Sequence, residues 1–224
     1  MNEFREAKRS LDGVTAALEK RALVWLAGRL PAWINSDHLT VLALAAMLGC
    51  GASYWLARST PSGLLLAVVF LAMNWFGDSL DGTLARVRRQ QRPRYGFYVD
   101  HVVDAVGALF LLGGLGLSGY MSPLVALGLL VTYLLLLVET FLAAYTLGTF
   151  TMSYFGVGPT ELRILLAIGN VVLLLHPMAD VLGREYRLFD AGGVVAIGGM
   201  IVTLLVATIR HTHALYRAEP ARVG

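Results

Sequence analysis

Four aspartates at helical spacing are the residues of this chain best suited to do chemistry. They stand in two runs, Asp78-x-x-Asp81-Gly82-x-x-Ala85-Arg86 and Gly96-x-x-x-Asp100-x-x-x-Asp104. Positions three or four apart share one face of an α-helix, so each run carries its two carboxylates on one stripe. The loop between the runs is short, and we therefore expect two antiparallel neighbouring helices whose four carboxylates meet.

Carboxylate oxygens of this kind suit hard divalent cations such as Mg²⁺ or Mn²⁺. Two ions would balance four negative charges and leave coordination positions for phosphate oxygens, as in two-metal sites for displacement at phosphorus. Arg86 and the arginines after it offer donors for phosphate groups, and Gly82 permits close approach of a ligand. The alternative is a set of Asp–Arg ion pairs that only holds two helices together, but four aspartates on matched faces exceed what that needs.

The composition indicates an integral membrane protein. Of 224 residues, 57% are hydrophobic and 15% are charged, and the mean hydropathy is +0.66. A soluble domain is about 45–50% apolar and about 25% charged. Carboxylates inside such apolar segments are costly and more often mark function than packing. The lone cysteine, Cys50, excludes an internal disulfide and a cysteine metal site.

We expect an all-α, polytopic fold made of one domain over residues 1–224. A membrane helix needs about 20 mostly apolar residues. Six stretches qualify, at residues 39–57, 63–85, 97–118, 122–146, 161–181 and 190–209. They form a six-helix bundle over 36–210, preceded by an amphipathic juxtamembrane segment (1–35) and followed by a cytoplasmic tail (211–224). Within the first segment, residues 10–30 have the apolar periodicity of an interfacial helix, with no cleavable signal peptide.

Basic residues set the expected orientation. An even number of spans places the amino-terminal segment, the loop after the second span and the tail on one side, and all three are rich in arginine. The positive-inside rule makes that side cytoplasmic. We therefore predict a multi-pass protein of the plasma or inner membrane whose active site faces the cytoplasm.

The two runs together resemble the signature of the CDP-alcohol phosphotransferase family, D-x-x-D-G-x-x-A-R followed by G-x-x-x-D-x-x-x-D, with every fixed position filled. The family usually has eight residues between the arginine and the second glycine, and this chain has nine, Val87 to Tyr95. The resemblance implies that a CDP-linked donor gives its substituted phosphate to an acceptor alcohol and releases CMP. It also implies a homodimer, about two Mg²⁺ or Mn²⁺ ions, and no nucleic-acid partner.

The resemblance assigns roles position by position. Asp78, Asp81, Asp100 and Asp104 would bind metal, with Asp104 also the base that takes the proton of the acceptor. The residues expected to contact the nucleotide are Gly82, Ala85, Arg86 and Gly96. The family's opening to the first span is matched in part by residues 36–40, which adds Asp37 and Thr40 to the nucleotide side.

Three further residues are candidates for binding the acceptor or its phosphate. Arg94 lies in the arginine-rich loop, and Arg163 either begins a helix or holds a phosphate. Glu139, inside the fourth predicted span, either lines the acceptor pocket or pairs with an arginine at a helix end. The identity of the donor and of the acceptor stays open.

Two other classes use carboxylates in membrane helices. Intramembrane prenyltransferases bind an isoprenoid diphosphate through aspartates, but they lack the G-x-x-A-R continuation and have more spans. A small metal or ion transporter also places carboxylates along its path, yet the arginines beside these aspartates would repel a cation. Release of CMP from a CDP-linked donor distinguishes the first class from both.

Overall fold

The computed structural model describes residues 8–10, 16–151 and 158–219. The described helices are α1 (Ala16–Ala27), α2 (Ser36–Ala57), α3 (Ser62–Val87), α4 (Pro93–Leu117), α5 (Pro123–Leu147), α6 (Pro159–Leu175) and α7 (Leu188–Ala218). The described residues also contain four short strands in two pairs, a parallel one between β1 (Lys8–Ser10) and β2 (Thr149–Thr151) and an antiparallel one between β3 (Met178–Val181) and β4 (Arg184–Arg187). The predicted helical class is confirmed, and the strands are short additions to it.

Five of the described helices, α2, α3, α4, α5 and α7, are long and apolar enough to cross a membrane. Their outer faces carry large apolar side chains, for example Leu124, which is 80% exposed on α5, and Val195, which is 76% exposed on α7. Helices that are apolar on all sides are typical of a lipid environment. The chain is therefore a multi-pass integral membrane protein. Helix α6, with 17 residues, stays outside this count.

The segment after α6 differs from the sequence prediction. The fifth span was expected over 161–181, but α6 ends at Leu175 and is followed by the β3–β4 hairpin. Pro177 cannot continue a helix. Leu182 and Gly183 then adopt positive φ angles of 56° and 78°, the backbone of a two-residue hairpin turn.

The two ends of the chain also differ from their predicted bounds. Helix α7 continues to Ala218, beyond the expected end at 209 and into the predicted tail, because neither glycine nor proline interrupts residues 200–218. Helix α1 ends at Ala27, before Gly28, rather than at residue 30. The part of the predicted amphipathic helix at 11–15 lies outside the described residues.

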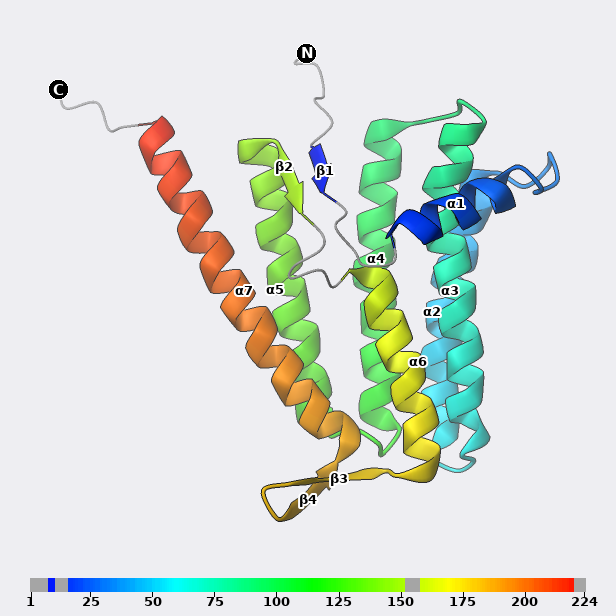
Figure 1. Cartoon of the computed structure of the whole chain (residues 1–224), viewed down its shortest axis with the longest axis vertical. Helices are drawn as coiled ribbons and strands as arrows, with labels where there is room; N and C mark the ends of the chain where they lie inside the picture. Colours follow the sequence, from blue (N-terminus) through cyan, green and yellow to red (C-terminus); the bar gives the residue numbers. More distant parts are fainter. Residues whose placement is uncertain (1–7, 11–15, 152–157, 220–224) are drawn as a thin grey trace.

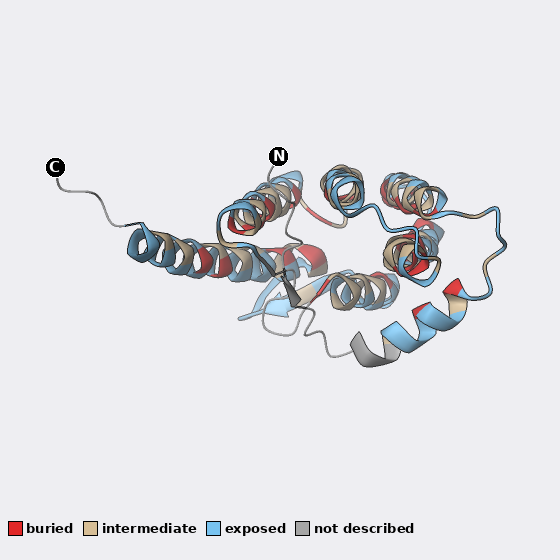
Figure 2. Cartoon of the chain, turned by 90° about the horizontal axis from the view of Figure 1, so that it is seen from above, coloured by how far each residue is buried: buried red, intermediate tan, exposed pale blue. Residues whose placement is uncertain are grey.

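Helices α2, α3 and α4 pack closely, because small residues let their backbones approach. A Cβ atom at Gly77 would stand 2.6 Å from the carbonyl oxygen of Leu39, and one at Gly114 would stand 2.2 Å from that of Gly51. Such contacts between small residues are a common basis of helix association in membranes. Viewed along the helices, buried residues face the neighbouring helices and exposed residues cover the outside (Figure 2).

Helix α1 lies across the bundle near the end of α3 that leads to α4, while α7 leans away from the other helices (Figure 1). Leu23 and Ala27 of α1 are buried in one cluster with Leu80 and Leu84 of α3. The connection to α2 is held by Arg88, whose Nη2 donates to the carbonyl oxygens of residues 30 and 31 at 3.0 Å each. Helix α1 is thus packed against α3, the helix that carries Asp78 and Asp81.

Candidate functional site

The four predicted aspartates lie on two helices that run in opposite directions. Asp78 and Asp81 belong to α3, and Asp100 and Asp104 belong to α4. The charge of Asp104 interacts with the charges of the three other carboxylates. The four side chains therefore lie on neighbouring helices, near enough to Asp104 for their charges to act on it.

Asp81 is held by the first turn of α2. The Thr40 hydroxyl donates to Asp81 Oδ2 at 2.7 Å, and the Ser36 hydroxyl donates to the Asp81 carbonyl oxygen at 2.9 Å. Asp37, between them, forms an ion pair with Arg92 of the α3–α4 loop. The residues that resemble the family's opening thus lie beside the aspartates. Thr40 contacts one of them directly, whereas Asp37 turns to the loop.

Asp78 is bound by a residue from a distant part of the sequence. Arg163 of α6 donates from Nη2 to Asp78 Oδ2 at 2.6 Å and from Nε to Asn74 Oδ1 at 2.7 Å. The two charged side chains are only 15% and 20% exposed. Asn74 in turn donates from Nδ2 to the Ala43 carbonyl oxygen of α2 at 3.0 Å. The Arg163 guanidinium therefore links α6 to α3 through both Asp78 and Asn74. The Asn74 amide is in turn held by a hydrogen bond to α2.

Asn74 was not singled out in the sequence, although a signal was present. It stands four residues before Asp78, on the same stripe of α3, and it is a buried amide in an apolar span. A buried amide needs hydrogen-bond partners. Here the partners come from α2 and α6, which local spacing does not identify.

The first turn of α6 is built to begin a helix. Pro159 occupies the first turn, and the Gly158 N–H donates to Glu161 Oε2 at 3.0 Å, an arrangement that favours helix starts. Arg163 follows one turn later and so reaches Asp78. Tyr133 of α5 lies near enough for the charges of Asp104, Asp78 and Arg163 to act on its phenol.

The glycines of the two runs leave space on the other side. A Cβ atom at Gly96 would meet no atom within 4 Å, and one at Gly82 would meet only an Arg86 guanidinium nitrogen, at 3.6 Å. Arg86 is exposed and donates from Nη2 to the Thr83 hydroxyl at 3.0 Å. Ala85 is half-buried one residue earlier. The surface formed by these residues has room for a ligand.

The other predicted residues are less close to the aspartates. Glu139 Oε1 lies 2.6 Å from His211 Nδ1 of α7, so its partner is a histidine of the last helix and not a helix-end arginine. Arg94 is exposed in the first turn of α4. Arg88 of the loop directs its donors to the connection between α1 and α2 in this structure.

The donor types fit a hard divalent cation, since the four carboxylates supply only oxygen. Among the residues that the structure describes, no three His, Cys, Asp or Glu side chains stand close enough to hold one ion as they are. Asp78 is bound by Arg163 and Asp81 by Thr40. To bind metal, Asp78 would therefore have to release Arg163, and Asp81 would have to release Thr40.

Comparison with known proteins identifies a family. The family model described as CDP-alcohol phosphatidyltransferase matches residues 33–209, well over half of the chain. The matched segment contains all four aspartates and Arg163. A comparison with curated proteins found no match.

Proposed function

Because the chain belongs to the CDP-alcohol phosphatidyltransferase family, which transfers a phosphate-linked group from a CDP-alcohol to an acceptor, we propose that the four-aspartate site performs this transfer with divalent metal. The observation that supports the proposal most is the placement of Asp78 and Asp81 on α3 and of Asp100 and Asp104 on the neighbouring α4, where the charges of the other three act on Asp104. A packing role alone would not require four like charges, whose repulsion is costly in an apolar setting.

The proposed reaction is a displacement at phosphorus. Asp104 takes the proton of the acceptor hydroxyl, and the acceptor oxygen forms a bond to the phosphorus distal to cytidine. The bond from that phosphorus to the bridging oxygen breaks, and CMP leaves with the electron pair. A base must lie within hydrogen-bond reach of the proton that it takes, directly or through one water.

The metal would be held by Asp78, Asp81, Asp100 and Asp104. Two bound Mg²⁺ or Mn²⁺ ions would offset the charge that develops on the phosphates. With Asp78 engaged in this way, Arg163 becomes available to a phosphate of the acceptor, which its planar guanidinium can bind through two parallel hydrogen bonds. In this proposal Arg163 is bound to Asp78 before the substrates bind and to a phosphate of the acceptor afterwards.

The nucleotide would lie along the side of the site that has room. Gly82 and Gly96 leave space there, Ala85 and Arg86 form the last turn of α3 beside it, and Thr40 borders it from α2. Asp37 and Arg94 would contribute at the rim. Glu139 is bonded to His211 on α7, so we leave it out of the proposed acceptor site.

We further propose six spans, with α6 as the short one. Its 17 residues lie at the lower limit for crossing a bilayer. An even number puts α1 and the arginine-rich loop on the cytoplasmic side, where α1, with Trp25 exposed, would lie in the interface. Cys50 is buried, so single cysteines introduced into a Cys50→Ala chain can report sidedness through their labelling by a membrane-impermeant maleimide.

The resemblance also supports a homodimer. Native mass spectrometry of the detergent-solubilised protein tests this, and a monomer at all concentrations would count against it.

The test of the function is CMP release by the purified protein in vesicles. We expect CMP from CDP-diacylglycerol with a polar alcohol such as glycerol phosphate, serine or a sugar alcohol phosphate, or from a soluble CDP-alcohol with diacylglycerol. The donor and acceptor that give CMP together identify the substrate pair. A protein that releases no CMP from any pair, but consumes an isoprenoid diphosphate or moves ions across the vesicle, would overturn the proposal.

A further inference from the structure

One carboxylate of α1 gathers hydrogen bonds from two helices of the site. Glu19 Oε1 accepts from Trp75 Nε1 at 2.7 Å and from the Ser79 hydroxyl at 3.2 Å, both on α3. The same oxygen accepts from the Thr160 hydroxyl of α6 at 2.8 Å. A single oxygen of α1 therefore joins this helix to α3 and α6.

Each of the three donors lies within one helical turn, along the sequence, of a residue in the hydrogen-bonded network formed by Asp78, Arg163 and Asn74. Trp75 follows Asn74, and Ser79 follows Asp78. Thr160 precedes Arg163 by three residues, which places both on one face of the first turns of α6. The residues that contact Glu19 are thus within one helical turn of the residues that bind one another in the Asp78–Arg163–Asn74 network.

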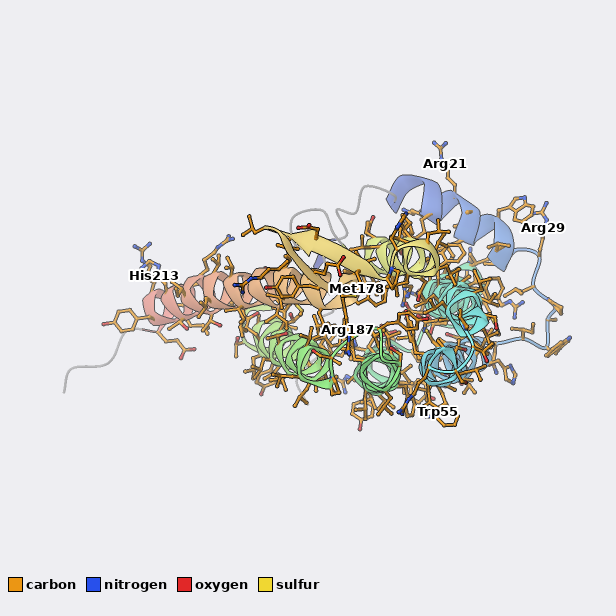
Figure 3. The ribbon with its side chains drawn as sticks, turned by 90° about the horizontal axis from the view of Figure 1, so that it is seen from below. Arg21, Arg29, Trp55, Met178, Arg187 and His213 are labelled. Atoms are coloured by element: carbon orange, nitrogen blue, oxygen red, sulfur yellow. The ribbon has the colours of Figure 1, made fainter. Side chains whose placement is uncertain are left out.

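Glu19 differs from the charged residues that follow it on α1. Lys20 and Arg21 are exposed, and Arg21 points away from the bundle, as does Arg29 beyond the helix end (Figure 3). Glu19 is half-buried, and its carboxylate bonds to three side chains. Hydrogen bonds to an ionised acceptor are shorter and stronger than those between neutral groups.

We propose that Glu19 is a positioning residue for the site. By holding Thr160 and Ser79 on one oxygen, it fixes the first turn of α6 against α3 and so keeps Arg163 at the aspartates. The position of α1 is thereby coupled to the placement of Arg163. This inference rests on the proposed function, in which Arg163 binds a phosphate of the acceptor.

The kinetic test uses two variants, each of which removes one partner of the hydrogen bond between Thr160 and Glu19. Glu19→Ala removes the acceptor, and Thr160→Val removes only the donor on α6. We expect each to raise the acceptor KM about tenfold, the ratio that one charge-assisted hydrogen bond supports, while the donor KM changes by less than about twofold. Glu19→Gln keeps an acceptor oxygen and should recover most of the loss. Arg21→Ala, on the same helix, should match the wild type.

A second readout does not depend on activity. Hydrogen exchange of backbone amides 162–166, in the first turns of α6, should be about tenfold faster in Glu19→Ala and in Thr160→Val than in Arg21→Ala. Exchange in the middle of α2 should be unchanged in all of them, which shows that the variants are folded.

The two readouts separate the inference from the proposed function. If the wild type releases no CMP, the proposed function fails, and the exchange rates still test the contact. If both variants show wild-type exchange at 162–166, or if their donor KM rises as much as the acceptor KM, the positioning role of Glu19 is wrong even in an active enzyme.

Discussion

Replacing Arg163 with methionine should destabilise the protein by an amount that the structure allows us to work out. The change removes the cation bonded to Asp78 at 2.6 Å and the bond to Asn74 at 2.7 Å. Methionine keeps an unbranched, apolar chain of similar length, so packing along α6 is retained. Asp78, only 20% exposed, would be left without this partner.

The magnitude follows from the two lost bonds. Removing one member of a buried ion pair costs about 3–5 kcal/mol, and the partial exposure of both side chains favours the lower end. A loss of about 3 kcal/mol corresponds to roughly 6–12 °C in Tm for a chain of this length. Asn74→Ala removes the second bond but leaves the pair with Asp78 intact, so it should cost about 1–2 kcal/mol.

The assay is thermal unfolding in detergent, followed by tryptophan fluorescence, with and without a chelator. In chelator, Arg163→Met should melt well below the wild type. With excess Mg²⁺ the difference should shrink, because bound cations would offset the charge of Asp78. Arg184→Met, on the exposed β3–β4 hairpin, is the matched control and should melt with the wild type under both conditions.

An Arg163→Met protein that melts within about 2 °C of the wild type in chelator would refute this reasoning. A Tm difference between Arg163→Met and the wild type that is the same with Mg²⁺ as without it would also refute the reasoning. Such a result would mean that bound metal does not take the place of Arg163 as the partner of Asp78.

Three further predictions concern turnover. Asp104→Asn should lower CMP release by about 10²–10⁴-fold, the usual contribution of a general base, while binding of labelled donor persists; unchanged release would remove Asp104 as the base. Excess chelator should abolish CMP release and Mg²⁺ or Mn²⁺ should restore it, whereas full activity in chelator would exclude a metal-dependent reaction. Thr40→Val, which loses the bond to Asp81, should reduce turnover about tenfold, with the exposed Thr60→Val as control; equal rates would show that Thr40 is dispensable.

The parts of the structure that follow a local period were predictable from the sequence. Apolar runs identified the helices that became α2, α3, α4 and α5 within a few residues of their bounds, because burial in lipid requires long apolar segments. Helical spacing placed Asp78 with Asp81 on one helix and Asp100 with Asp104 on another, and the short loop implied that these helices would be neighbours.

Contacts between distant segments were not predictable in this way. The bonds of Arg163 to Asp78 and of Glu19 to Thr160 join residues 85 and 141 positions apart, and no spacing rule relates them. The β3–β4 hairpin was missed because Leu182-Gly183 is a weaker turn signal than Asn-Gly. The partner of Glu139 was also missed, since His211 lies in a segment expected to be a tail.

The most direct test of the central claim is CMP release by four single variants, in which asparagine replaces Asp78, Asp81, Asp100 or Asp104, measured beside the wild type. Asp180→Asn, on the hairpin near Gly183, is the control for the same chemical change elsewhere. We predict a loss of at least about 100-fold in each of the four and wild-type release in the control. Release that persists in all four variants would contradict the claim that these carboxylates form the active site.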